Sequence, residues 1–246
     1  MHLFFVDENQ IESEFIRITG ADVNHISKVL RLPLQEEILI SNRQGLEYCC
    51  IIDSIDKDFI NCKILSIEES NQELPAKIYL FQGLPKQDKM ELIIQKSIEL
   101  GVYEIVPVAM ERSIVKLNSS KKDKKADRWQ KIAESAAKQS HRGIIPRVHE
   151  PLSFKEAMKY AKELDTIIVP YEKANQAQYS KEVFSKLNNF NSIGIFIGPE
   201  GGFAKQEISE IEDLGASIVT LGKRILRTET AGLVVLSIIM FNMEVG

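Results

Sequence analysis

Short apolar and β-branched runs dominate residues 1–72. Such runs at 2–6, 14–18, 37–42, 46–54 and 59–68 are separated by turn-forming residues, which predicts a small β-barrel. Between them, Val23, Ile26, Val29 and Leu30 recur at helical spacing, and Asp22 is placed to cap that helix. We therefore expect a barrel interrupted by one helix at 22–30.

The pattern changes after a polar stretch at 70–76, which we interpret as a linker. Beyond it, strand-like runs at 77–82, 104–109, 166–171, 193–198 and 217–221 alternate with helical patterns at 87–100, 127–140, 153–163, 177–187, 204–214 and 229–243. Alternation of this kind specifies a parallel sheet with helices on both faces. The sequence thus predicts an α/β protein with one domain at 1–72 and a second at 73–246.

Several predicted helices have a recognisable core face. In the helix at 87–100 this face comprises Met90, Ile93, Ile94, Ser97 and Ile98, and Gly101 is expected to end the helix. Trp129 shares a face with Ala133 and Ala136, which favours a core position over a base-stacking one. The last helix is apolar nearly all round and needs cover on every side, which a second subunit could provide.

Charge is distributed unevenly along the chain. The net charge of −4 by itself argues mildly against a nucleic-acid partner. Residues 1–72 carry 6 Lys/Arg against 13 Asp/Glu, whereas residues 111–147 carry 11 against 4, a local net of +7. Such a patch can steer a polyanion even when the whole chain is acidic. For the lysine run at 121–125 alone, a solvated loop is the better interpretation.

The cysteines and histidines indicate neither a disulfide framework nor a metal site. Cys49, Cys50 and Cys62 lack zinc-ligand spacing and fit a reducing cytosol as small strand residues. The four histidines form no ligand cluster. No basic region followed by an apolar core begins the sequence, so no signal peptide is expected, and the apolar run at 231–241 is too short to span a bilayer. We expect a cytoplasmic protein.

Two late glycine loops carry the strongest functional signal. The apolar runs 193–197 and 217–221 each lead into a glycine loop and then a helix, which places both loops at the carboxyl ends of strands, where ligands bind. Neither loop matches the P-loop or the Gly-x-Gly-x-x-Gly pattern. Either loop alone fits an ordinary turn. Together they indicate a binding site, because they also contain Glu200, Arg224, Arg227 and Glu229.

The sequences of these loops resemble a known family. Ile197-Gly-Pro-Glu-Gly-Gly-Phe203 with Leu221-Gly-Lys-Arg-Ile-Leu-Arg-Thr-Glu-Thr-Ala231 is similar to the SPOUT methyltransferases. Within them it resembles the ribosomal RNA small subunit methyltransferase E family, which methylates N3 of a uridine in 16S rRNA. The stretches 82–90, 95–102 and 136–142 match that family as well, so the resemblance spans roughly the whole chain.

The resemblance implies an architecture and a set of partners. It implies a PUA-like RNA-binding barrel at 1–72 and a SPOUT domain with a C-terminal trefoil knot at 73–246. It also implies a homodimer formed through the C-terminal domain, S-adenosylmethionine bound in the knot, and 16S rRNA or the small ribosomal subunit as substrate. No metal is required, because the sulfonium already activates its methyl group.

The expected cofactor contacts come from three loops. The side chains of Leu221, Ile225 and Leu226 suit adenine, and the loop after strand 166–171 completes the pocket. The full set is Val169, Pro170, Tyr171, Ile197, Gly198, Pro199, Glu200, Gly201, Gly202, Leu221, Gly222, Arg224, Ile225, Leu226, Thr230 and Ala231.

Three residues are candidates for catalysis. Uracil N3 carries a proton at neutral pH, so transfer requires a proton acceptor or a cation that stabilises the anionic base. Arg227 is the candidate cation, because guanidinium stays charged and presents a planar fork. Glu200 and Glu229 are candidate acceptors, although each could equally cap a helix or hold an arginine. For Glu229, in the first turn of the last helix, we prefer the cap.

Candidate RNA contacts are basic or polar residues at helix ends and near the loops. They are His25, Arg31, Lys86, Lys89, Arg112, Lys138, Gln139 and Arg142, each of which also fits ordinary surface charge. An RNA-binding assembly factor without turnover is the alternative function, and the intact loop 198–202 and Arg227 argue against it. A phosphate-binding hydrolase needs a lysine or metal ligands in the glycine loop, and 198–202 has neither.

Overall fold

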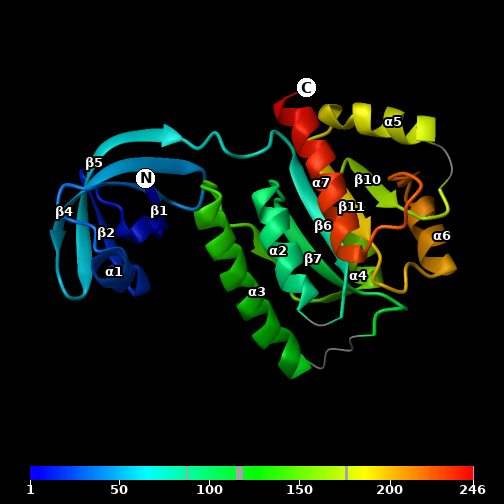
Figure 1. Ribbon diagram of the computed structural model, residues 1–246, viewed down its shortest axis with the longest axis horizontal. Coiled ribbons are helices and arrows are strands. Elements are labelled where there is room, and N and C mark those ends of the chain that lie inside the picture. The colour runs from blue at the N-terminus through cyan, green and yellow to red at the C-terminus, as the bar shows by residue number, and fades with distance from the viewer. Residues whose placement is uncertain (87, 115–118, 175–176, 246) are drawn as a thin grey trace. The chain divides into compact units, whose positions relative to one another are not determined.

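The chain forms two compact units, each with its own hydrophobic core (Figure 1). The computed structural model describes residues 1–86, 88–114, 119–174 and 177–245. The first unit comprises Met1–Glu73 and Ala137–Ile145, and the second comprises Leu74–Ala136 and Pro146–Gly246. A short segment far along the chain therefore belongs to the N-terminal unit.

The first unit is built on five strands, and all five were predicted. They are β1 His2–Phe5, β2 Phe15–Thr19, β3 Glu37–Ser41, β4 Leu46–Ile55 and β5 Phe59–Glu69, in the order β1-β3-β4-β5-β2. The β1–β3 pair is parallel and the other pairs are antiparallel. The sheet curls around its core, but in the described part of the chain its edge strands β1 and β2 do not pair with each other. It is a curled half-barrel, which agrees with the small β-barrel domain that we expected.

The helix predicted at 22–30 is present with a different geometry. It begins as α1 Ala21–Asn24 and continues as a π-helix, η2 His25–Leu30. Asp22 lies inside the first turn instead of at the N-cap, so the predicted cap is wrong. Ile26 is fully buried, but Val29 is 64% exposed because the wider π-helical turn shifts side chains away from the 3.6-residue spacing.

The second unit contains a seven-stranded sheet in which every pairing is parallel, as predicted. Its strands are β6 Lys77–Gly83, β7 Glu104–Ala109, β8 Arg147–Val148, β9 Leu152–Ser153, β10 Thr166–Pro170, β11 Ser192–Ile197 and β12 Ser217–Val219. The order is β12-β10-β11-β6-β7-β8, and β9 also pairs with β7. Only β8 and β9 were not predicted, because two residues are too few to show a period.

All six predicted helices of this region are present. They are α2 Lys89–Glu99, α3 Ser119–Gln139, α4 Phe154–Ala161, α5 Ala177–Ser185, α6 Lys205–Asp213 and α7 Thr228–Glu244, with a short 3-10 turn at η3 Leu187–Asn189; the first unit has another at η1 Glu8–Gln10. Residue 87, the predicted start of the second unit's first helix, lies outside the described residues. Helix α3 begins well before its predicted start at 127, so the lysine run 121–125 is helical and its interpretation as a loop is wrong.

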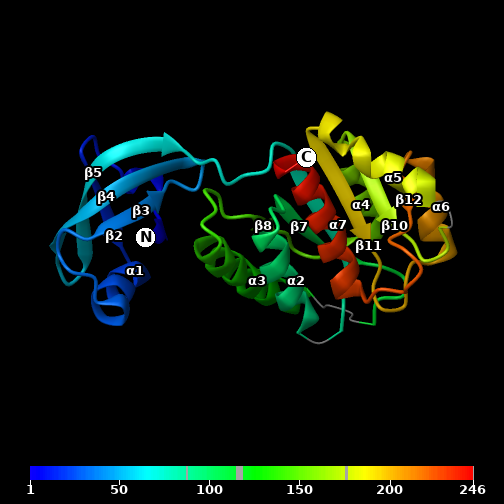
Figure 2. The same cartoon turned by 45° about the horizontal axis from the view of Figure 1, so that its top comes forward.

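Helices cover both faces of the parallel sheet (Figures 1 and 2). Helices α4 and α6 pack on the face that carries Phe81 and Phe196, whose rings are stacked with centroids 4.4 Å apart. Helices α2 and α7 contact each other, and α7 lies against β11. Loops after β10, β11 and β12 lie at the carboxyl ends of these strands.

The predicted core positions named for α2 and α3 are confirmed. All five residues assigned to the core face of α2 are buried. Gly101 follows the end of α2 with φ of 86°, a left-handed conformation that suits a glycine. Trp129 is 4% exposed and is therefore a core residue.

Candidate functional site

Loops from three neighbouring strands enclose one pocket. The loops after β10, β11 and β12 line a cavity of about 500 Å³, together with Lys89 at the start of α2 and residues at the start of α7. Because β10 pairs with both β11 and β12 in parallel, their carboxyl ends lie at one edge of the sheet. Loops separated along the sequence thus share one cavity.

Most of the expected cofactor contacts line this pocket. The exceptions are Val169, which is fully buried in β10, and Thr230, which is exposed in the first turn of α7. Sequence reasoning did not place Lys89 in the pocket and missed Phe203, Thr220, Lys223 and Thr228. The two stretches that resemble the family, 197–203 and 221–231, are called the two motifs below. Phe203 and Thr228 belong to these motifs, and that position could have identified them as pocket residues. Thr220 and Lys223 flank loop residues that were recognised.

The loop after β11 is a tight turn held by its neighbours. The Gly202 N–H donates to the Pro199 carbonyl at 2.8 Å. Arg112 Nη1 donates to the Gly201 carbonyl at 3.1 Å. A Cβ at Gly201 would lie only 2.9 Å from the Arg112 Cβ, so this close approach requires glycine. Arg112, a candidate RNA contact, therefore supports the turn.

The loop after β12 presents apolar side chains from a fixed backbone. Gly222 has φ of 114°, a conformation that favours glycine, and its N–H donates to Thr220 Oγ1 at 3.2 Å. The Thr220 N–H in turn donates to Ser180 Oγ of α5 at 2.9 Å. Ile225 is 82% exposed and lines the pocket. An apolar side chain in that position suits an aromatic or apolar ligand group.

Four charged side chains form one cluster, and three of them, Lys89, Glu200 and Arg227, line the pocket. The Lys89 ammonium lies 3.1 Å from Glu200 Oε1 and 3.3 Å from Glu229 Oε2. Arg227 Nη1 lies 3.9 Å from Glu229 Oε1, and the Arg227 side chain is 79% exposed. Lys89 therefore contacts one carboxylate from each motif, and the Arg227 guanidinium remains largely open to solvent.

The environment of Glu200 keeps it ionised. Burial raises the pKa of Glu200, but hydrogen bonds from its own backbone N–H, the Lys86 N–H and the Lys89 ammonium outweigh burial and hold that pKa below its ordinary value. The hydrogen bond to Glu200 is the main cause that raises the pKa of Lys89. A lowered pKa makes Glu200 a weaker base. This geometry therefore favours a role in holding the Lys89 ammonium over a role as proton acceptor.

Glu229 lies in the first turn of α7, where its charge complements the helix dipole. The N-cap of α7 is Arg227, without a side-chain capping bond. Glu229 thus stabilises the helix start by position and is also paired with Lys89. Both interpretations of this residue, first-turn charge and partner of a cation, fit the structure.

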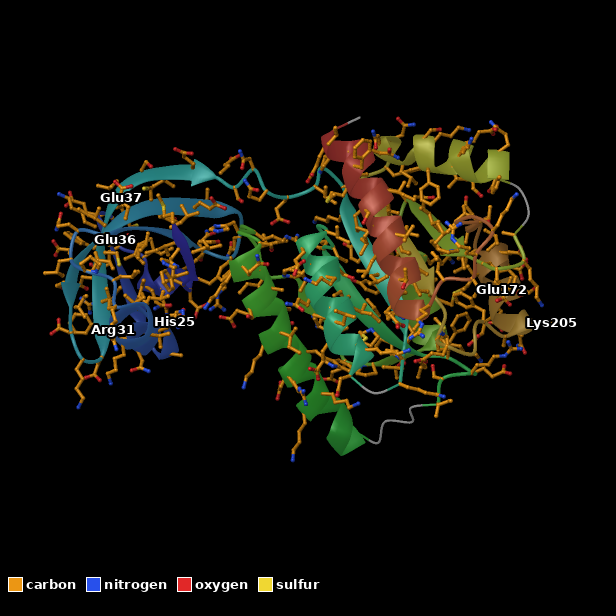
Figure 3. All side chains as sticks on the ribbon, in the orientation of Figure 1. His25, Arg31, Glu36, Glu37, Glu172 and Lys205 are labelled. Atoms are coloured by element: carbon orange, nitrogen blue, oxygen red, sulfur yellow. The ribbon has the colours of Figure 1, made fainter. Side chains whose placement is uncertain are left out.

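The expected RNA contacts fall into different environments. Lys86 and Arg112 are exposed in the second unit. In the first unit, His25 and Arg31 are exposed and project from the short helical segment (Figure 3), and Gln139 is exposed at the end of α3. Lys138 is bound to Asp22 at 3.1 Å. These residues stay candidates for RNA contact.

Arg142 requires a correction. It is 3% exposed, and its guanidinium is bound to the Glu73 carboxylate, with Nε donating to Oε1 at 3.2 Å. A guanidinium buried in this way stabilises the first unit and presents no charge to a phosphate. Its predicted role as a surface RNA contact is therefore wrong for this structure.

Other site chemistries find no support in the part of the chain that the structure describes. Among the described residues, no three His, Cys, Asp or Glu side chains gather as a metal ion would require. No helix there is both long and apolar enough to cross a bilayer. The three cysteines are free strand residues, and burial raises the pKa of Cys50 and Cys62 to about 12, so both thiols are protonated at neutral pH.

Comparison with known proteins agrees with this architecture. Residues 72–240 match the family model of an RNA methyltransferase domain, and residues 18–65 match that of an RNA methyltransferase PUA domain. The chain is 38% identical to ribosomal RNA small subunit methyltransferase E of Bacillus subtilis over 99% of this chain and 98% of the relative. It is 34% identical to the protein of that name from Mesomycoplasma hyopneumoniae over 96% and 98%.

Solved structures are similar over nearly the whole chain. The crystal structure of a ribosomal RNA small subunit methyltransferase E from Neisseria gonorrhoeae, bound to S-adenosyl methionine, matches with a TM-score of 0.83 and 32% identity over 96% of this chain and 95% of that one. A putative methyltransferase from Legionella pneumophila in complex with the same cofactor matches with a TM-score of 0.82 and 28% identity over 96% of each chain.

Fold, pocket and family models together define an α/β RNA methyltransferase with an N-terminal PUA domain. Within that class, the chain belongs to the ribosomal RNA small subunit methyltransferase E family.

Proposed function

We propose that the protein transfers the methyl group of S-adenosylmethionine to N3 of a uridine in 16S rRNA. The observation that carries this proposal is the single pocket formed by both motif loops at the carboxyl ends of β10, β11 and β12. Its volume of about 500 Å³ suits a cofactor-sized ligand. The relatives from Neisseria gonorrhoeae and Legionella pneumophila, which hold S-adenosylmethionine, support the choice of cofactor.

The residues present fit this cofactor. Leu221, Ile225 and Leu226 supply apolar surface for adenine, and the loops 170–172 and 197–203 close the other walls. The bound cofactor supplies an electrophilic methyl group on a sulfonium. The protein's contribution is to fix that methyl in line with the attacking nitrogen, because positioning supplies much of the rate of such a displacement.

Arg227 is the residue to which we assign stabilisation of the target base. Uracil N3 attacks only after losing its proton, and the resulting negative charge spreads onto O2 and O4. The Arg227 guanidinium is 79% exposed at the pocket and can donate two hydrogen bonds to such oxygens. Glu229, between Lys89 and Arg227, stays the candidate proton acceptor, and Glu200 holds Lys89 in place.

The test is the position of the transferred methyl group. Purified protein, labelled cofactor and small ribosomal subunits from a strain lacking this activity should give label on uridine N3, identified by mass spectrometry of nucleosides. Arg227→Ala should abolish labelling, and Lys155→Ala, an exposed change on α4, should not. Label on a ribose oxygen would assign the protein to another kind of RNA methyltransferase. Absence of any cofactor binding would favour an assembly factor.

We propose further that residues 1–72 form the RNA-binding domain, that residues 73–246 form the methyltransferase domain, and that the protein acts in the cytosol as a homodimer.

The surface of α2 and α7 supports the proposed homodimer. The apolar side chains of Phe241 on α7 and Leu92 on α2 are 58% and 46% exposed, and α2 and α7 contact each other. An apolar surface of this kind suits a second copy of the C-terminal domain. The trefoil knot stays a prediction from the family. Light scattering tests the dimer, and a monomeric mass would contradict it.

A further inference from the structure

A fully buried glutamine lies directly behind the pocket. Gln82 is 0% exposed near the carboxyl end of β6, and it does not line the cavity. Its Nε2 donates to Thr228 Oγ1 at 2.9 Å and to the Gly83 carbonyl at 3.0 Å. The side chain lies on the face of the sheet toward α7, near Gly232. The Gln82 amide thus links the central strand to the first residue of the last helix.

Thr228 also connects to the loop after β11. Its hydroxyl donates to the Gly198 carbonyl at 2.6 Å. A hydroxyl has one proton to donate, so the bond between Gln82 and Thr228 must be one that the threonine accepts. That requirement fixes the orientation of the Gln82 amide. A directed chain of hydrogen bonds therefore runs from Gln82 through Thr228 to Gly198, where the first glycine loop opens.

The oxygen of the Gln82 amide, Oε1, lowers the stability of the folded protein. Gln82 Oε1 is buried and has no hydrogen-bond partner among the residues that the structure describes. A buried acceptor without a partner destabilises a protein, and an apolar side chain of similar length would avoid that penalty. A residue that breaks a rule of packing in this way is expected where function requires it. In Gln82, the group that meets such a requirement is Nε2, which donates the hydrogen bond to Thr228.

We propose that Gln82 and Thr228 are positioning residues that hold the two motif loops in register for cofactor binding. The inference rests on the proposed function, because it takes the pocket as the cofactor site. Gly198 opens one loop, and Thr228 ends the other, so a single hydroxyl fixes their separation. Gln82 in turn fixes the rotamer of Thr228 from the rigid centre of the sheet.

The experiment compares cofactor affinity with fold stability in four single variants and in the double variant that combines Thr228→Val with Gln82→Met. Thr228→Val keeps the shape and removes the hydroxyl, and Thr228→Ser restores it. Gln82→Met keeps the length and removes the donor. Ser97→Ala removes another fully buried side-chain hydroxyl, in α2. Isothermal calorimetry with S-adenosylmethionine, thermal unfolding and steady-state kinetics on small subunits are measured for each.

Thr228→Val and Gln82→Met should each raise the Kd for cofactor about tenfold, which corresponds to the loss of one well-placed hydrogen bond. The KM for cofactor should rise with little change in kcat. Thr228→Ser should stay within threefold of the wild type, as should Ser97→Ala. The double variant should bind no more weakly than Thr228→Val alone, because both changes break one chain. Gln82→Met should unfold at the wild-type midpoint or above it, because the unpaired acceptor is gone.

Two results would overturn the proposal in distinguishable ways. A wild-type protein that binds no cofactor removes the proposed function and this inference with it. Wild-type binding together with an unchanged Kd in both Gln82→Met and Thr228→Val overturns the inference alone. Should Thr228→Val fail to fold, an unchanged Kd in Gln82→Met is sufficient to overturn it.

Discussion

The Lys89 ammonium lies 3.1 Å from the Glu200 carboxylate, and this pair joins the start of α2 to the first glycine loop. The same nitrogen lies 3.3 Å from Glu229 at the start of α7. Lys89 therefore balances one carboxylate from each motif. Arg227 lies 3.9 Å from Glu229 and remains 79% exposed, so the two cations compete for one carboxylate, with Lys89 at the shorter distance.

Lys89→Met should lower kcat about tenfold or more, although Lys89 is not assigned to the reacting base. Without Lys89, Glu229 should pair more closely with Arg227, now 3.9 Å away, and draw the guanidinium away from the substrate. The measurement is kcat and KM with small subunits as substrate. Lys96→Met is the matched control, because Lys96 lies on the same helix and pairs with Glu99 away from the pocket. Equal kcat in both variants would contradict the competition.

The ion pair also predicts how stability depends on pH. The folded protein holds the pKa of Glu200 below its ordinary value of 4.5, so the folded state binds protons less readily than the unfolded state. The stabilisation by Glu200 is therefore complete above that ordinary pKa and is lost as pH falls through the lower folded pKa. Urea unfolding of wild type and Glu200→Gln should differ by a constant amount at pH 6–7 and converge in acid.

The control for this pH dependence is Glu163→Gln, a change at an exposed position after α4. Its difference from the wild type should stay small at every pH. A Glu200→Gln difference that grows as the pH falls would contradict the expected direction. Such a result would mean that Glu200 is protonated more readily in the folded protein than in the unfolded chain.

Periodicity and motif spacing predicted most of the fold, because the apolar faces of long elements repeat. They indicated the parallel sheet and the buried face of α2, including Ser97. Where no apolar stripe exists, they failed. The first turns of α3 are rich in lysine, a good helix former that leaves no periodic signal, so the helix was predicted to start at 127 instead of Ser119. The π-helical turn at His25–Leu30 misplaced Val29 for a related reason, since its period is not 3.6.

The site was predictable in its backbone and less so in its side-chain partners. Glycine positions and motif order identified both loops, but partners from elsewhere in the chain have no local signature. Gln82 reaches Thr228 across 146 positions, and Lys89 reaches Glu200 across 111. Arg142 was expected at the surface because charged residues are mostly exposed, and its burial depends on Glu73, which lies 69 positions away. Pairings of this kind follow from the tertiary fold.

Gly83→Ala should destabilise the protein and weaken cofactor binding. A Cβ at Gly83 would lie 2.6 Å from the Pro199 nitrogen and 2.7 Å from its Cδ, so the backbone of the glycine loop must move. Overpacking of this kind costs about 1–3 kcal/mol. Urea unfolding and calorimetry with S-adenosylmethionine measure the two effects. Gly232→Ala, a change within α7, is the control. Its Cβ would lie 3.5 Å from the Ile197 side chain of β11, which is an ordinary van der Waals contact. That variant should be neutral or more stable, since alanine favours a helix.

Arg142→Met and Arg31→Met should separate a structural arginine from an RNA contact in the first unit. Arg142 is 3% exposed and bound to Glu73, whose side chain is 24% exposed. Removing Arg142 leaves a partly buried carboxylate without its partner, which should lower the free energy of unfolding by about 2–3 kcal/mol, less than for a fully buried pair. Arg31 is exposed, so its loss should leave stability within about 0.5 kcal/mol and weaken binding to 16S rRNA. Urea unfolding and filter binding at two salt concentrations measure both effects.

If Arg142→Met kept full stability and lost RNA affinity with a reduced salt dependence, the arginine would be a phosphate contact after all, and the ion pair with Glu73 would have to open when RNA binds.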